Sequence, residues 1–290
     1  DIFPNSHSFS ETNLRYMRSF YELYSDIENL PQHGESLANE ISPQVEEKLE
    51  LNIFLIPWGH NKVIIDKCKN NQELALFYVQ KVLENNWSRN VLLNFLDTNL
   101  YEREGKAITN FNRLLPDVQG ELAQALTKDP YNFDFLAIRE KYDEKELKDA
   151  LMDNITNFLL ELGNGFAFVG REVRLEIGNT EKFIDMLFYN IKMKCYVVLK
   201  VKVSGFDSSY AGHLGTYVVA VNHQLKSEND NPTIGLLVCK DMDKVEASYA
   251  LESSSQPIGV SGYELSKLIP EDFKGTLPTI EEIEEELNNK

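Results

Sequence analysis

The segment Phe183–Tyr189 reads Phe-Ile-Asp-Met-Leu-Phe-Tyr, so any strand that it forms carries apolar side chains on both faces. A strand of this kind belongs in the middle of a sheet whose two faces are covered. Asp185 is the one carboxylate in the segment. A buried carboxylate is costly unless it is paired or binds a metal. The segment therefore predicts a covered sheet with one charged position that needs a partner.

The next apolar run, Cys195–Val203, supplies candidate partners for this carboxylate. It contains Lys200 and Lys202, which share one face of a strand because strand side chains alternate. A buried aspartate that faces lysines on the neighbouring strand indicates a site for a phosphate or a metal ion. The alternative is a structural salt bridge between Asp185 and one of the two lysines.

Composition limits the class of protein. At 290 residues the chain is long enough for two domains. Its net charge of -17 argues against nucleic-acid binding over the whole surface, but it allows a local basic cleft. The three cysteines lie far apart and lack zinc-site spacing, which predicts reduced, buried thiols in a cytoplasmic protein. No apolar run is long enough to span a bilayer, so no membrane partner is expected.

The first hundred residues have helical periodicity. Apolar stripes predict helices over residues 11–30, with Ser10 as the N-cap, and over residues 71–85. Ser88 is expected to cap a further helix through Phe95. Short helices joined by tight turns allow a helix-turn-helix that reads DNA, with plain helical core packing as the alternative.

The second half changes its period from helical to two. A long amphipathic helix is expected over residues 144–162 and ends at Gly163. An alternation of strands and helices then implies an α/β layer with a mixed sheet. The predicted strands cover residues 166–177, 183–189, 196–203, 233–239 and 257–263, and the predicted helices cover residues 210–225 and 243–251.

These patterns predict three parts. Residues 1–115 form a helical domain for DNA or partner binding, in which residues 104–115 are a connector. Residues 116–270 form the α/β domain. Residues 271–290 form an acidic C-terminal helix or tail. The tail is either a solvated helix or an acidic arm that shields a basic cleft or binds a protein partner.

Several motifs carry a resemblance to a known family. From about Phe9 to Tyr263 the chain resembles the YhcG family of bacterial proteins, whose C-terminal half is a PD-(D/E)XK nuclease domain. The resemblance implies an all-helical N-terminal domain followed by a restriction-endonuclease-like α/β domain with a central mixed sheet. The motifs are Phe158–Gly163 (FLLELG), Gly165–Arg171 (GFAFVGR), Phe183–Tyr189 (FIDMLFY), Pro257–Val260 (PIGV), Asn13–Tyr21 (NLRYMRSFY) and Glu84–Arg89 (ENNWSR).

The same resemblance implies a reaction and its residues. It implies hydrolysis of DNA that depends on Mg²⁺ or Mn²⁺, with Asp185 and Glu161 as metal ligands. Lys202 matches the motif lysine, and a lysine beside a metal-bound water can orient the nucleophile or stabilise developing charge. DNA is thus the expected partner. A homodimer, and a protein partner bound by the helical domain or the acidic tail, are further expectations.

Two positions depart from the family pattern. Lys200 stands where family members have glutamate, and His213 stands where they have glutamine. The Lys200 ammonium can pair with Asp185 and take the place of the cation, which would weaken or abolish metal binding. A migrated acid from the strand that carries Glu172 and Glu176 could rescue the site. His213 stays a candidate catalytic residue beside a packing role. The chain is either a nuclease with lost or altered activity, with Lys200 native or introduced, or a non-catalytic module that binds nucleic acid or protein.

Overall fold

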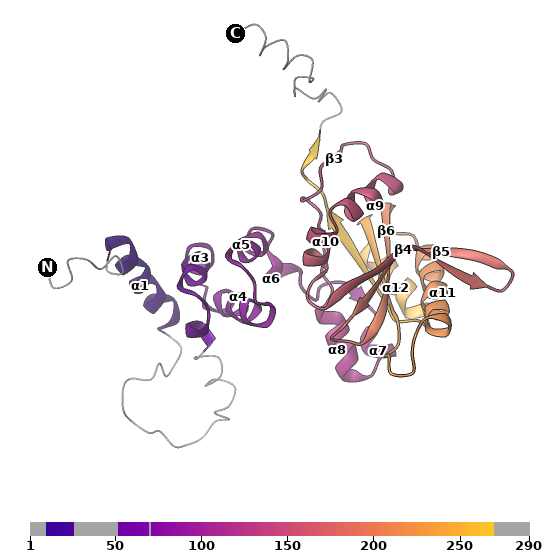
Figure 1. Cartoon of the computed structure of the whole chain (residues 1–290), viewed down its shortest axis with the longest axis horizontal. Helices are drawn as coiled ribbons and strands as arrows, with labels where there is room; N and C mark the ends of the chain where they lie inside the picture. Colours follow the sequence, from indigo (N-terminus) through magenta and orange to yellow (C-terminus); the bar gives the residue numbers. More distant parts are fainter. Residues whose placement is uncertain (1–9, 26–51, 70, 270–290) are drawn as a thin grey trace, which may run out of the picture. The chain divides into compact units, whose positions relative to one another are not determined.

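The computed structural model of the chain describes residues 10–25, 52–69 and 71–269 (Figure 1). The chain divides between Glu102 and Arg103 into two compact units. The first is helical, and the second is built around a mixed sheet. Within the described ranges, no helix has both the length and the apolar character needed to cross a membrane. The predicted acidic tail over residues 271–290 lies outside these ranges.

The first unit is a set of short helices around its own apolar core. Ser10 and Ser88 cap their helices as predicted, because their hydroxyl oxygens accept from the N–H groups of Asn13 and Val91. Large buried side chains such as Tyr78 and Phe95 fill the core. The described helices are α1 (Glu11–Tyr24), α3 (Trp58–Cys68), α4 (Gln72–Asn85), α5 (Arg89–Asp97) and α6 (Leu100–Arg103), which ends at the first residue of the second unit.

The apolar stripe of α1 is only partly covered. Tyr24 is fully buried, and the ring of Phe20 packs against it. Leu14, Met17 and Tyr21 are exposed, although they share the predicted apolar face. The stripe is therefore wider than the surface that α3 covers among the described residues. The helix was predicted to run to residue 30, but α1 ends at Tyr24, and residues 26–51 lie outside the described part.

The second unit has a mixed sheet, as predicted. Its strands follow the order β1-β8-β7-β6-β5-β4, and β2 also pairs with β8. β6, β7 and β8 run parallel, whereas β4, β5 and β6 are antiparallel neighbours. The strands are β1 (Ile108–Thr109), β2 (Tyr131–Asn132), β4 (Phe166–Ile177), β5 (Thr180–Asn190), β6 (Cys195–Gly205), β7 (Ile234–Asp241) and β8 (Ile258–Glu264). A small separate sheet pairs β3 (Ile138–Arg139) with β9 (Leu268–Ile269).

Helices cover both faces of this sheet (Figure 1). Leu199 and Val201 of β6 point into one core, and Val198 points into the other. The alternation explains why the central strands are apolar throughout. One core lies under α7 (Phe111–Leu114), α8 (Asp117–Ala125), α9 (Glu144–Asp153) and α10 (Ile155–Leu162), and the other under α11 (Ser208–Gln224) and α12 (Lys244–Ser253).

Two sequence predictions for this unit are wrong in detail. The helix expected over residues 144–162 is broken at Asn154, whose φ of -109° and ψ of 32° are not helical. The Asn154 side chain donates to the Ala150 carbonyl, a local bond that competes with helix continuation. The expected connector over residues 104–115 contains α7 and the edge strand β1. A strand of two residues is too short to show a period of two.

The three cysteines are buried free thiols, as predicted. Burial raises the pKa of Cys68, Cys195 and Cys239 to about 12 in each case. At pH 8 the reactive thiolate is then roughly one part in ten thousand. We expect the folded chain to resist Ellman's reagent over minutes and to release three equivalents of colour in denaturant. Fast release of one equivalent from the folded chain would contradict this burial.

Candidate functional site

The strands β5 and β6 part at the predicted site. They pair from Asn190 opposite Cys195 as far as Met186 opposite Leu199. Asp185 and Lys200 are the next residues, and beyond them β5 continues beside β4 while β6 continues beside β7. The parting strands form a fork, and the side chains at the fork can meet residues from α9, which packs on β6.

Asp185 lies between two ammonium groups at this fork. Its Oδ1 accepts a hydrogen bond from Lys148 Nζ at 3.1 Å. Its Oδ2 is 3.7 Å from Lys200 Nζ, and so the predicted pairing with Lys200 is present. Oδ2 is buried and has no hydrogen-bond donor among the described residues. The three side chains are only 16–17% exposed, and the carboxylate is therefore largely shielded from water.

Lys202 is held by a different acid. Its Nζ donates to Glu144 Oε2 at 2.7 Å, and Glu144 Oε1 is 3.6 Å from Lys148 Nζ. The charges thus alternate along a chain from Lys202 through Glu144, Lys148 and Asp185 to Lys200. We call these five residues the lysine–carboxylate cluster. Sequence patterns did not single out Glu144 or Lys148, and the one available signal was their spacing of four on a predicted helix.

Local structure positions each member of the cluster. A capping box at Asp143 and Glu146 fixes the first turn of α9, where Glu144 lies, and Lys148 follows one turn later. On the other side α11 presents two aromatic rings. Lys200 Nζ lies 5.6 Å from the centre of the Tyr217 ring, and Lys202 Nζ lies 5.0 Å from that of Tyr210. Each ring face attracts the ammonium beside it.

The cluster carries three positive and two negative charges. Unit charges about 4 Å apart attract by about 4 kcal/mol at an effective dielectric constant of about 20, less the cost of removing them from water. Burial opposes the charge of Lys148, but its hydrogen bond to Asp185 and the nearby charges of Asp185 and Glu144 raise its pKa above the ordinary value. Lys148 is therefore a cation at neutral pH, and the Asp185 carboxylate is held from two sides.

Glu161 is engaged elsewhere. It is 4% exposed near the end of α10, and its Oε1 accepts from Arg103 Nη1 at 2.6 Å and from the Asn132 backbone N–H at 2.9 Å. Neither partner belongs to the cluster. Beside it, burial and the charge of Glu161 raise the pKa of Tyr131. The geometry around Glu161 is that of a buried ion pair.

The remaining candidates also lie outside the cluster. His213 is exposed on α11, and it has no hydrogen-bond or ion-pair partner among the described residues. Glu176 pairs with Arg174 Nη2 at 2.7 Å on the exposed part of the β4–β5 hairpin. Glu172 has a positive φ of 50°. The predicted rescue of the site by an acid from this strand finds no contact that supports it.

The cluster does not fit a divalent cation as it stands. Mg²⁺ takes oxygen ligands from carboxylates, carbonyl groups and water. Both carboxylates of the cluster face ammonium groups instead. In the described ranges no three His, Cys, Asp or Glu side chains gather where they could hold a metal ion. Ammonium groups occupy the position beside Asp185 where the resemblance leads us to expect a metal ion.

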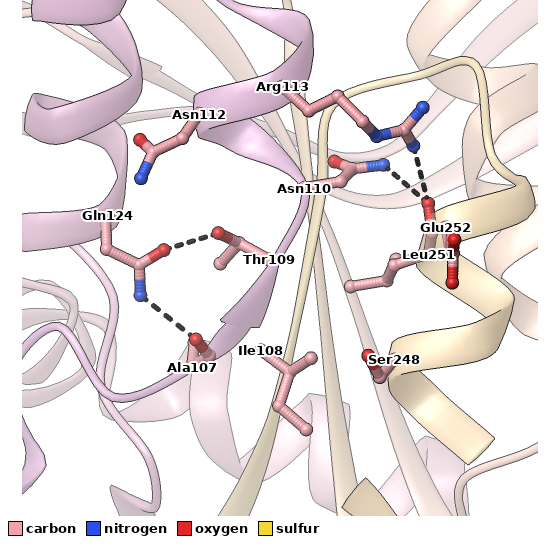
Figure 2. Close-up of a pocket in the computed structure, with 10 residues that line it drawn as sticks. All are labelled: Ala107, Ile108, Thr109, Asn110, Asn112, Arg113, Gln124, Ser248, Leu251 and Glu252. Carbon is pink, nitrogen blue, oxygen red and sulfur yellow. Dashed lines mark hydrogen bonds between the residues drawn. The ribbon is translucent and has the colours of Figure 1, made fainter. Parts of the chain in front are cut away.

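A separate cavity of about 530 Å³ lies at the edge of the sheet beside β1 (Figure 2). None of the predicted site residues lines it. Arg113 Nη2 and Asn110 Nδ2 both donate to the Leu251 carbonyl, at 2.9 and 3.1 Å. Across the cavity the Thr109 hydroxyl donates to the Gln124 side chain. The first pair of bonds ties α12 to the start of α7, the last ties β1 to α8, and the polar groups around the cavity therefore have structural partners.

Two family models match this chain. A model of the YhcG PDDEXK nuclease domain matches residues 124–278, and a model of the DUF1016 N-terminal domain matches residues 1–103. The chain belongs to the YhcG family. Its second unit is a PD-(D/E)XK nuclease-family domain with a restriction-endonuclease-like fold, as the sequence motifs predicted.

A bacterial relative is similar over most of this chain. The YhcG protein of Escherichia coli (strain K12) is 27% identical over 295 residues, which cover 94% of this chain and 77% of the relative. Among solved structures, a repair endonuclease from Pyrococcus abyssi is 17% identical, covers 44% of this chain and 49% of its own, and gives a TM-score of 0.30. EndoMS in complex with double-stranded DNA is 17% identical, with coverages of 45% and 46% and a TM-score of 0.29. This chain thus spans about half of each of these two structures.

Proposed function

We propose that this member of the YhcG family binds DNA without cutting it and without a divalent metal. The observation that carries the proposal is the position of Asp185 between the ammonium groups of Lys148 and Lys200. Each oxygen of this carboxylate faces an ammonium group, so a divalent cation that bound there would meet two positive charges. Nuclease chemistry of this class depends on the cation for charge neutralisation at phosphorus, and so loss of the metal removes the reaction.

The same cluster supports binding of a phosphate backbone. The cluster has one net positive charge in a chain whose overall charge is -17. It is therefore a local positive site that can attract a phosphate group. Lys202 is 17% exposed and already makes one charged hydrogen bond, to Glu144 at 2.7 Å. A phosphate oxygen can replace that carboxylate oxygen as the acceptor. Binding of this kind depends strongly on salt.

The second candidate is metal-dependent cleavage of DNA. It is favoured by the buried Asp185 Oδ2, an acceptor without a hydrogen-bond donor among the described residues. It is also favoured by Lys202, which stands at the position that resembles the motif lysine. In this case a cation would have to displace Lys200 from its 3.7 Å contact with Asp185. The helix-turn-helix, the homodimer and a protein partner for the first unit or the tail stay predictions.

One experiment separates the two functions. Labelled duplex DNA is titrated with the full chain at about 50 mM salt, in EDTA and in Mg²⁺ or Mn²⁺, and plasmid and linear DNA are incubated in parallel. We expect that metal does not raise the affinity, that binding weakens as salt rises, and that no DNA is cleaved. Lys202→Ala should weaken binding and lower the salt slope by about 1. The matched control, Lys192→Ala, lies in the exposed turn at the other end of β5 and should change neither quantity.

Two outcomes would reject the proposal. Absence of binding at low salt would leave no role for DNA. Cleavage that needs metal and disappears in Asp185→Ala would instead establish the second candidate. Circular dichroism of each variant checks that the fold is kept.

A further inference from the structure

The two ammonium groups beside Asp185 together carry the charge of one divalent cation. Lys148 approaches Oδ1 at 3.1 Å, and Lys200 approaches Oδ2 at 3.7 Å. Each oxygen of the carboxylate therefore faces its own positive charge. A divalent ion bound by the same carboxylate would supply those two charges from one centre. The sequence departure at Lys200 accounts for only one of them.

Lys148 is the closer and the more firmly placed of the two. It makes a true hydrogen bond to Asp185, whereas the distance from Lys200 is too long for one. Glu144 holds the Lys148 ammonium from the other side at 3.6 Å, and the capping box fixes the helix that carries both residues. Its pKa is raised above the ordinary value despite burial, because Asp185 and Glu144 stabilise the charged form.

We propose that Lys148 and Lys200 jointly replace the divalent cation at Asp185, and that Lys148 alone is enough to keep metal out. The proposal rests on the proposed function and goes beyond it, because it assigns a role to a residue on α9 that the sequence pattern did not single out. Restoring an acid at position 200 leaves the Lys148 ammonium on Asp185. Two changes are then needed before a cation finds oxygen ligands there.

Lys148→Met removes the charge and keeps much of the length of the side chain. It also frees Glu144 Oε1, which faces Lys148 at 3.6 Å. Combined with Lys200→Glu, it leaves Asp185 with a new carboxylate on the neighbouring strand and no ammonium on either oxygen. Carboxylates grouped in this way are what Mg²⁺ and Mn²⁺ bind.

The test is calorimetric titration of MnCl₂ into four full-length proteins, with the melting temperature measured in parallel. The native chain, Lys148→Met and Lys200→Glu should each show no specific binding. The double variant Lys148→Met/Lys200→Glu should bind one Mn²⁺ at least about tenfold more tightly than any of them, and Mn²⁺ should raise its melting temperature. Adding Asp185→Asn to the double variant should abolish both effects.

A matched control holds the net charge constant. Lys192→Met/Lys200→Glu has the same charge as the double variant but keeps Lys148, and it should not bind Mn²⁺. If Lys200→Glu alone binds as tightly as the double variant, Lys148 does not exclude metal and the proposal fails. It also fails if the folded double variant binds nothing, or if the native chain binds Mn²⁺ through Asp185.

Two further provisions keep the result decisive. If the double variant does not fold, Lys148→Gln/Lys200→Glu, which keeps a neutral donor at position 148, is titrated in its place under the same criteria. DNA affinity is measured separately on the native chain. If the native chain does not bind DNA but the variants bind Mn²⁺ as expected, the proposed function is rejected and the role of Lys148 stands.

Discussion

We expect Glu161→Ala to lower the unfolding free energy of the second unit by about 3–5 kcal/mol. Glu161 and Arg103 are 4% and 6% exposed at the side chain and lie 2.6 Å apart. Removal of the carboxylate takes away the charge that Glu161 places beside the buried guanidinium, and the Asn132 N–H loses its acceptor at 2.9 Å. Breaking a buried ion pair is among the largest single-site effects on stability.

Thermal unfolding followed by circular dichroism measures this effect, with an expected fall of about 10 °C or more in melting temperature. Glu176→Ala is the matched control, because Glu176 also pairs with an arginine but its side chain is 67% exposed. Its change should stay within about 0.5 kcal/mol. If Glu161→Ala melts like the native chain, the structural role of Glu161 is wrong.

The second large effect is expected for Phe188→Ala, at about 3–5 kcal/mol. Phe188 is fully buried in the middle of β5, and its ring makes edge contacts with the rings of Phe158, Phe166 and Phe168. Truncation removes apolar area and the aromatic contacts, and it leaves a cavity that a sheet held on both sides cannot close. The loss should appear as earlier unfolding in urea.

Phe183→Ala is the control on the same strand. Phe183 is 49% exposed, and its truncation should cost less than about 1.5 kcal/mol. Equal losses from the two substitutions would mean that Phe188 is not in the core that the structure describes. A changed urea slope with Phe188→Ala would mean that the compactness of the unfolded or folded state has changed, or that the unfolding is no longer two-state.

Strands of the second unit were predictable because their signals are long and consistent. The strand expected over residues 166–177 is present with the same bounds, and its charged and apolar side chains alternate over the last six residues, from Glu172 to Ile177. Helix breaks and very short strands were not predictable. Asn154 interrupts a helix through a bond made by its own side chain, and β1 exists because β8 offers it an edge. The first depends on a local side-chain bond and the second on a tertiary contact, and neither is visible in the apolar period of the sequence.

The candidate site was predictable in part for a similar reason. Asp185 and Lys200 lie on consecutive strands, and adjacent antiparallel strands bring such residues together. The contact between Lys148 and Asp185 spans 37 residues and depends on where α9 crosses the fork. The partner of Glu161, Arg103, lies 58 residues earlier in the chain. Charge pairs at these separations cannot be recognised from the spacing of residues in the sequence. The predicted metal role of Glu161 therefore rested on the family resemblance alone.

The fork between β5 and β6 has a mechanical consequence. From Asp185 back to Thr180, β5 pairs with β4 and with no second strand in the part of the chain that the structure describes, and a two-stranded ribbon is marginally stable by itself. The side chain of Gln224 bonds the ribbon at the N–H and C=O of Glu176. At the other end the ammonium group of Lys148 fastens β5 to α9. The Lys148–Asp185 ion pair therefore helps to hold the β4–β5 ribbon against the rest of the unit, and its loss should make the ribbon more mobile.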